Sequence, residues 1–282
     1  SEMISAIAGE TIWAIETLFP KEIGRDEQEV EEELDEAIGG SVWSAIPARK
    51  SGYIQALDDK ALLKQARELD IVIRMELGIG DFVIKGTPLV SISQSKEADD
   101  ETINAINESF HISNYRTVMQ DADFGIRQIV DIAIKALSPG VNDTTTATTS
   151  IDYLGSILCS TVRRRIPSQF RYDEGELRVI ARGPTFDSLT NRALNEIRQN
   201  ADGNVAVILR LLTVLRTIGK LSPNSYRSRR LWRHAVLVSE VADSSVKSAH
   251  DRLVINRCLI EAAQDLHQEM SGSILIPVSK QI

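Results

Sequence analysis

Residues 120–147 read QDADFGIRQIVDIAIKALSPGVNDTTTA, and this stretch carries the strongest structural pattern in the 282-residue chain. Its first half repeats apolar side chains at the spacing of an α-helix. These apolar side chains, together with that of Val118 just upstream, belong to Phe124, Ile126, Ile129, Val130, Ile132, Ala133, Ile134 and Leu137. They cover more than half of the helix circumference, which is typical of a helix buried on several sides. We therefore expect a buried helix over residues 115–137.

Three charged residues interrupt this apolar helix at regular spacing. Asp123, Arg127 and Asp131 are four residues apart, so they lie on one face of the helix. The stripe is either a ladder of ion pairs on a half-exposed face or a charged surface that faces a cleft or a subunit interface. A buried charge without a partner costs several kcal/mol, so we expect each of the three to have one.

A break follows the helix. Pro139 cannot continue a helix and Gly140 turns the chain, so the helix is expected to end near Ser138. Asn142 or Asp143 can then cap a second helix, because a short polar side chain accepts the free backbone N–H groups of the first turn.

The first turn of this second helix holds Thr144, Thr145 and Thr146. Their hydroxyls and the free N–H groups converge on a small volume that can hold an anion. The oxygens of Asn142 and Asp143 could instead hold a cation, or the arrangement is simply a helix cap. The candidate ligand-binding residues are Asp123, Arg127, Asp131, Ser138, Gly140, Asn142, Asp143, Thr144 and Thr145.

Residues 42–93 have a different sequence pattern, in which short β-rich runs are separated by Gly and Pro. Residues 80–92, GDFVIKGTPLVSI, resemble the second half of a barrel-sandwich, the fold of biotinyl and lipoyl carrier domains. Such carriers present a modified lysine on a hairpin tip, whereas Lys60 opens a helical stretch. We therefore expect a rigid spacer or an assembly surface and no lysine modification.

These patterns predict an α+β protein with three parts. Residues 1–38 form an amphipathic helix and an acidic linker, in which residues 26–36 are an exposed helix or linker. Residues 39–96 form the small barrel-sandwich-like β subdomain. Residues 97–282 form a mainly helical subdomain with a β-hairpin near 166–182 and a possible last strand at 274–278. The expected later helices cover residues 99–110, 143–164, 186–199, 205–219, 229–246 and 251–270.

Composition and missing motifs narrow the function further. A net charge of −8 argues against nucleic-acid binding, which needs a basic surface. The two cysteines, Cys159 and Cys258, lie in apolar helical segments and suit a reducing compartment. The sequence contains no run of about 18 apolar residues, so it predicts no transmembrane helix. The four histidines are scattered, and no nucleophile or nucleotide-binding motif occurs, so we assign no catalytic residue, no metal site and no cofactor.

Four segments resemble the bacterial predicted membrane protein family called domain of unknown function 2254; they are residues 51–58, 80–89, 120–147 and 178–204. The resemblance implies that a membrane region of several helices precedes a soluble portion, and that residues 4–20 lie next to that membrane region. One position departs from the family, which usually has proline where Thr144 stands here. The family carries no assigned activity that the resemblance could transfer.

Three hypotheses for the function remain open. The first is a non-enzymatic domain of a channel, transporter or sensor that assembles as a homo-oligomer on the cytoplasmic side of the bacterial cell membrane. The second is a sensor domain that binds an anion, an ion or a small ligand at the candidate site. The third is an enzyme of unrecognised class that uses Asp123, Asp131 and Asn142, and it requires these side chains to converge in one pocket.

Overall fold

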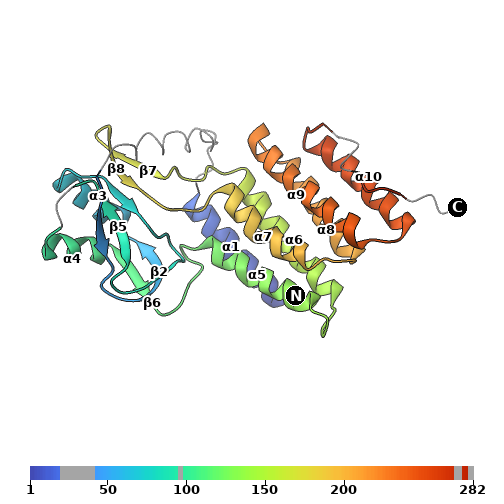
Figure 1. Ribbon diagram of the computed structural model, residues 1–282, viewed down its shortest axis with the longest axis horizontal. Helices are drawn as coiled ribbons and strands as arrows, with labels where there is room; N and C mark the ends of the chain where they lie inside the picture. The colour runs from blue at the N-terminus through green and yellow to red at the C-terminus, as the bar shows by residue number, and fades with distance from the viewer. Residues whose placement is uncertain (20–41, 95–97, 270–274, 279–282) are drawn as a thin grey trace. The chain divides into compact units, whose positions relative to one another are not determined.

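The computed structural model describes residues 1–19, 42–94, 98–269 and 275–278 (Figure 1). It confirms an α+β fold. The chain divides into two compact units, each built from separate stretches of sequence. The helical unit comprises Ser1–Gly24, Gly125–Arg165 and Thr185–Ile282, and the β unit comprises Arg25–Phe124 and Ile166–Pro184. The acidic stretch at residues 26–36 lies outside the described residues.

The strands of the β unit form two sheets. One sheet has the order β1-β5-β3-β8-β7, built from Ser44–Pro47, Pro88–Ile92, Ile73–Met75, Glu176–Ile180 and Phe170–Asp173. The other has the order β4-β2-β6, built from Phe82–Val83, Gly52–Leu57 and Phe110–Ser113. Neither sheet closes into a barrel within the described residues, so the structure does not support the expected barrel-sandwich.

One parallel strand pair ties the later hairpin to the first sheet. β3 pairs in parallel with β8, whereas the other strand pairs are antiparallel. The predicted turn between β7 and β8 holds two left-handed residues, Glu174 and Gly175, with φ of 50° and 87°. Such a turn matches the twist of the flanking strands. Residues 166–184 therefore complete the β unit although they follow α6 in sequence.

Two short helices pack in the β unit, and each begins at an aspartate. Asp58 caps α3 (Asp59–Glu68) and Asp99 caps α4 (Asp100–Glu108), because each carboxylate accepts a backbone N–H of the first turn. The buried core of this unit includes Ile46, Ile54, Leu62, Ile73, Leu89, Val90 and Ile106. Strand β6 was not predicted; the expected helix over 99–110 ends at Glu108, and Phe110 begins the strand.

Helix α5 is shorter than predicted. It spans Ala122–Leu137 and does not begin at residue 115, because Asp121 accepts the N–H of Phe124 at 3.0 Å in the manner of a helix cap. The other helices of the helical unit are α1 (Glu2–Leu18), α6 (Thr144–Val162), α7 (Phe186–Gln199), α8 (Val205–Gly219), α9 (Ser225–Ser245) and α10 (Ala249–Asp265). The expected last strand is not formed by residues 275–278.

Close helix contacts in the helical unit depend on glycine. Gly125 of α5 faces Thr11 of α1, and a Cβ added at Gly125 would overlap the Thr11 hydroxyl and its Cβ. Thr11 is fully buried and donates its hydroxyl to Ile7 O at 2.7 Å. Gly155 of α6 similarly faces Val214 of α8. A missing side chain thus lets neighbouring helices approach where a larger residue would force them apart.

Two buried arginines bind the carboxyl ends of helices. Arg227 of α9 donates to the carbonyl oxygens of Val162 and Arg164 at 2.6 and 3.0 Å, at the end of α6. Arg164 in turn donates to Phe19 O at 3.0 Å and pairs with Glu16 at 2.7 Å, at the end of α1. The last carbonyls of a helix lack intrahelical partners and carry its negative dipole end, so a cation there satisfies both needs.

The fit between α1 and α5 gives a first prediction. Gly125→Ala should destabilise the protein by about 1–3 kcal/mol, because the added methyl group overpacks against buried Thr11. Amide hydrogen exchange should also speed up across α1. Gly140→Ala is the matched control, since nothing lies within 4 Å of a Cβ at that position. Equal unfolding midpoints for the two variants in denaturant would contradict this account.

Candidate functional site

The loop between α5 and α6 is closed by its own hydrogen bonds. Ser138 donates its hydroxyl to Lys135 O at 2.7 Å, and the N–H of Asn142 donates to Ser138 O at 2.9 Å. Asn142 adopts the left-handed conformation with φ of 48°. The N–H of Asp143 returns to Ala136 O at 2.8 Å. The predicted break is thus a tight turn whose backbone groups largely find partners inside it.

Asp143 caps α6, as one of the two predicted cap positions. Its Oδ1 accepts the N–H of Thr146 at 3.0 Å, and its Oδ2 accepts the Thr146 hydroxyl at 2.6 Å. These hydrogen bonds lower the pKa of Asp143, because they stabilise the carboxylate. The carboxylate already occupies the position that an anion would take at this helix start. The structure therefore favours a cap over an anion site here.

Asn204 joins two helix starts. It caps α8, because its Oδ1 accepts the N–H of Val207 at 3.2 Å. Its Nδ2 donates to Thr144 Oγ1 at 3.0 Å, at the first residue of α6. The capping role of Asn204 could be predicted from sequence, whereas its contact with Thr144 could not. Thr145 and Gly140 are exposed beside this junction.

The charged stripe on α5 is made of ion pairs. Arg127 pairs with Asp131 at 2.6 Å and also with Glu196 of α7. Burial alone would lower the pKa of Arg127, but the two carboxylates raise it. The Arg127 and Asp131 side chains are 31% and 54% exposed, which fits a half-exposed ladder of ion pairs. Asp123 has a different partner, Arg116, at 3.4 Å.

A second ion-pair cluster lies in the β unit, where sequence reasoning found no site. Arg116 pairs with buried Asp121 at 2.8 Å and its guanidinium lies over the ring of Phe124. Gly80, with φ of 92°, leaves the space that this pair occupies. Burial raises the pKa of Asp121, and Arg116 offsets only part of that effect. The cluster anchors the start of α5 against the turn before β4.

The structure does not bring the whole predicted set together. Asp123 pairs within the β unit, Asp131 pairs with Arg127 on α5, and Asn142 is exposed in the loop. The carboxylate set of the enzyme hypothesis is therefore not convergent. A shallow groove of about 500 Å³ lies elsewhere in the β unit, and no predicted site residue lines it; its lining is Ala56, Leu57, Asp58, Asp59, Lys60, Glu108, Ser109, Phe110 and His111.

A polar seam between α7 and α9 is the feature that sequence reasoning missed. Asp187 lies 3.8 Å from Arg230 of α9 and accepts the amide of Asn191 at 3.2 Å. The Asn195 amide continues this row to Asn191 at 3.4 Å. The three residues of α7 are spaced four apart, so the row could have been read as one polar helix face. That this face meets another helix is visible only in the fold.

Three buried atoms of this region have no hydrogen-bond partner among the described residues: Asn195 Oδ1, Arg198 Nε and His234 Nδ1. His234 of α9 is only 2% exposed. Burial lowers the pKa of His234 to about 4; Asp187 acts in the opposite direction, and Arg198 and Arg233 add to the lowering. The histidine is thus neutral at physiological pH. Buried polar groups without partners are uncommon in folded proteins, and an ordered water or a small polar ligand can satisfy such groups.

The described part of the chain offers neither a metal-binding cluster nor a membrane-spanning helix. No three His, Cys, Asp or Glu side chains there are grouped so that they could hold a metal ion. Over the same residues, no helix combines the length and the apolar character that crossing a bilayer requires.

The sequence of the chain matches a family of predicted membrane proteins. The model of the family described as "Predicted membrane protein (DUF2254)" matches residues 1–217, and the chain belongs to this family. It is 26% identical over 243 residues to an uncharacterised protein of Mycobacterium bovis and, equally, to one of Mycobacterium tuberculosis. These alignments cover 83% of this chain and 46% of each relative, so the chain spans about half their length. No solved structure matches the chain.

The lowered pKa of His234 predicts a pH dependence of stability. Between the unfolded pKa of 6.5 and the folded pKa of about 4, the unfolded chain binds the proton more strongly, so stability falls as the pH falls. From about pH 7 to about pH 5 the loss should be about 1–2 kcal/mol. His234→Gln should lack this part of the loss in urea titrations, whereas His250→Gln, at an exposed histidine, should retain it. Identical pH profiles for His234→Gln and the unaltered protein would contradict the assignment.

Proposed function

We propose that this chain is an assembly and regulatory domain of a bacterial membrane protein of channel or transporter type. In this proposal the membrane region belongs to the part of the relatives' length that the chain does not span, and α1 lies next to it. The domain associates with itself and lies on the cytoplasmic side. Support comes from membership of a predicted membrane protein family and from the way α1 is built into the helical unit.

The observation that carries the proposal is the rigid attachment of α1. Thr11 fits against Gly125 of α5, and Arg164 at the end of α6 donates to Phe19 O and pairs with Glu16. Side chains in such close packing cannot be displaced independently. A movement of α1 would therefore pass to α5 and α6, which carry the loop of residues 138–143. This is the coupling that a regulatory domain beside a membrane region needs.

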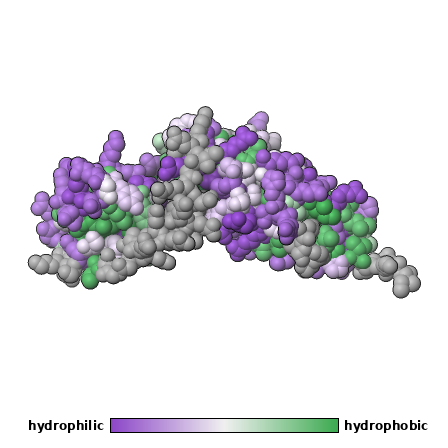
Figure 2. All heavy atoms as spheres, turned by 90° about the horizontal axis from the view of Figure 1, so that it is seen from above, coloured by the Kyte–Doolittle hydropathy of each residue, from purple (hydrophilic) through white to green (hydrophobic). Residues whose placement is uncertain are grey.

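An exposed apolar stripe on α10 supports self-association. Leu253, Val254 and Ile260 are 56%, 36% and 41% exposed, and Leu253 and Ile260 are two helical turns apart on one face. Figure 2 shows apolar surface at the end of the helical unit that carries α9 and α10. Contiguous apolar surface on a helix is typical of a protein–protein contact.

The cysteines support the cytoplasmic side. Cys159 and Cys258 are free, and burial raises the pKa of both thiols. A raised pKa keeps a thiol protonated and unreactive, and unpaired cysteines suit a reducing compartment.

Light scattering after size exclusion tests self-association. The protein should elute with a mass above the 31.2 kDa of one chain, and the mass should rise with concentration. Leu253→Ser together with Ile260→Ser should weaken the association about tenfold, because the polar side chains remove apolar contact area. Met119→Ser, at another exposed apolar residue, is the control. A single-chain mass at every concentration would overturn the assembly role.

A second candidate function, a sensor for a small oxyanion, rests on the seam between α7 and α9. Arg198 Nε offers a donor and Asn195 Oδ1 an acceptor, and both are buried without a partner among the described residues. An oxyanion that carries its own proton, such as hydrogen phosphate or bicarbonate, can satisfy both kinds of group. Sulfate lacks that proton at neutral pH.

Thermal unfolding with each anion tests this second function. Hydrogen phosphate or bicarbonate should raise the melting temperature in proportion to the logarithm of concentration, and sulfate should raise it less. Asn195→Leu should abolish the difference between phosphate and sulfate, because it removes the unpartnered acceptor. Equal shifts for all three anions, or none, would exclude the seam as a specific site.

A further inference from the structure

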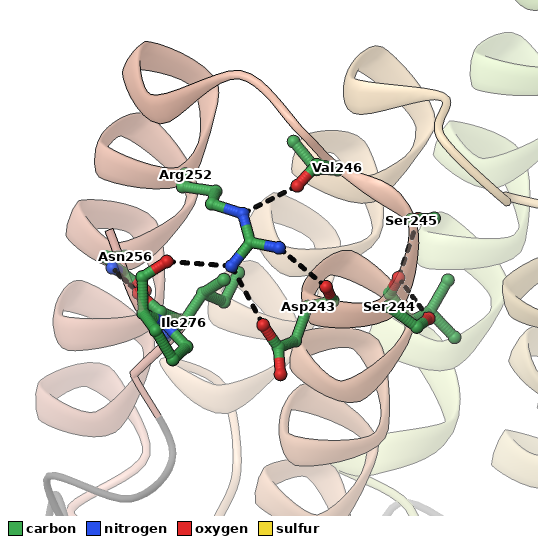
Figure 3. Close-up of polar contacts among 9 residues, drawn as sticks. Asp243, Ser244, Ser245, Val246, Arg252, Asn256 and Ile276 are labelled. Atoms are coloured by element: carbon green, nitrogen blue, oxygen red, sulfur yellow. Dashed lines mark hydrogen bonds and ion pairs between the residues drawn. The ribbon is translucent and has the colours of Figure 1, made fainter. Parts of the chain in front are cut away.

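The side chain of Asn256 binds an extended segment of backbone. Its Nδ2 donates to Ile276 O at 2.8 Å, and its Oδ1 accepts the N–H of Ile276 at 2.8 Å. Figure 3 shows Asn256 on α10 beside Ile276 of the segment that returns along this helix. An amide that holds both the N–H and the carbonyl of one residue acts as a neighbouring strand would. This contact recognises the backbone of the segment, whatever its sequence.

Arg252, one turn before Asn256, holds the same segment and the end of α9. It donates to Pro277 O at 2.7 Å. It also donates to Val246 O at 2.6 Å and to Asp243 O at 2.7 Å, and it pairs with the Asp243 carboxylate at 2.9 Å (Figure 3). The carbonyl acceptors belong to the last turn of α9, to its C-cap Val246 or to the segment of residues 275–278. The Arg252 guanidinium thus links α10 to the end of α9 and to the segment of residues 275–278.

One side chain anchors the segment by burial. Ile276 is 2% exposed, whereas Pro277 is exposed and Leu275 and Val278 are half-buried. Burying an isoleucine side chain fully contributes about 1.5–3 kcal/mol. The segment is therefore held by backbone hydrogen bonds and one aliphatic anchor, which is the usual chemistry of a site that binds an extended peptide.

We propose that Arg252, Asn256 and the pocket of Ile276 form a peptide-binding groove, and that residues 275–278 of a second copy fill this groove in the assembled protein. The segment occupies its own groove in the structure, and an identical segment from another chain makes identical contacts. Exchange of identical elements is a low-cost route to a dimer.

The position of the groove favours a second copy over another partner. Arg252 and Asn256 lie on α10, the helix that also exposes Leu253 and Ile260. An exchanged segment would bring another copy onto this helix, where it can cover the apolar stripe. The inference rests on the self-association proposed above and assigns a route to it.

Two complementary variants test the exchange. Ile276→Asp disables the segment but keeps the groove, whereas Asn256→Ala weakens the groove but keeps the segment. Each variant alone should associate about tenfold more weakly than the unaltered protein. An equimolar mixture should regain association as mixed dimers, because one variant supplies the groove and the other the segment. Sedimentation velocity with one variant fluorescently labelled measures this, and circular dichroism checks that both remain folded.

A synthetic peptide of residues 273–280, SILIPVSK, tests the groove without a second copy. It should bind Ile276→Asp, whose own segment no longer competes, and should not bind the double variant that also carries Asn256→Ala. No binding to either protein would overturn the groove, and binding without mixed dimers would overturn the second copy as its occupant. If the unaltered protein associates and the mixture does not, the exchange fails and the assembly role stands. If neither associates, both fail.

Discussion

Two buried arginines at helix carboxyl ends hold the helical unit together. Arg227 satisfies the last carbonyls of α6, and Arg164, just beyond that helix, satisfies those of α1. Each guanidinium carries donors in a planar fork, so one side chain can serve several carbonyls that no backbone group reaches. The ring of Phe186 on α7 lies 5.0 Å from the Arg227 guanidinium. One series of contacts made by these two arginines therefore links four helices, α1, α6, α7 and α9.

The local parts of the fold follow from the sequence. Helices α7 and α8 have their predicted bounds, because each begins at a side chain that caps it, Thr185 or Asn204, and carries a clear apolar face. The turn between β7 and β8 could also be predicted from sequence, since Gly175 stands where a left-handed residue is required. The beginning of α5 was misplaced because apolar spacing continues upstream of it, whereas Asp121 sets the start through a hydrogen bond that only geometry reveals.

In the candidate site, too, contacts between residues close in sequence could be predicted, and contacts between distant residues could not. Asp143 could be predicted as a cap, and the partners of Arg127 and Asp131 could be predicted on α5, since all of these lie within four residues in sequence. Glu196 and Asn204 could not be assigned as partners, because α7 and α8 reach α5 and α6 only through the tertiary fold. The seam around His234 was invisible for a further reason: a polar helix face looks solvent-exposed until another helix covers it.

The interleaving of the two units has a consequence for any attempt to divide the protein. The β unit needs β8, which is made after α6, and the helical unit needs α1, which is made before β1. No single cut releases either unit with all its parts, so each is a discontinuous domain. During synthesis, roughly one hundred residues must be added after β3 before its parallel partner β8 is made. A similar length of chain separates α1 from Gly125, against which Thr11 packs. The β unit is therefore complete in sequence at Pro184, whereas the helical unit still lacks α7 to α10 at that point, so a stop there leaves the helical unit unfinished.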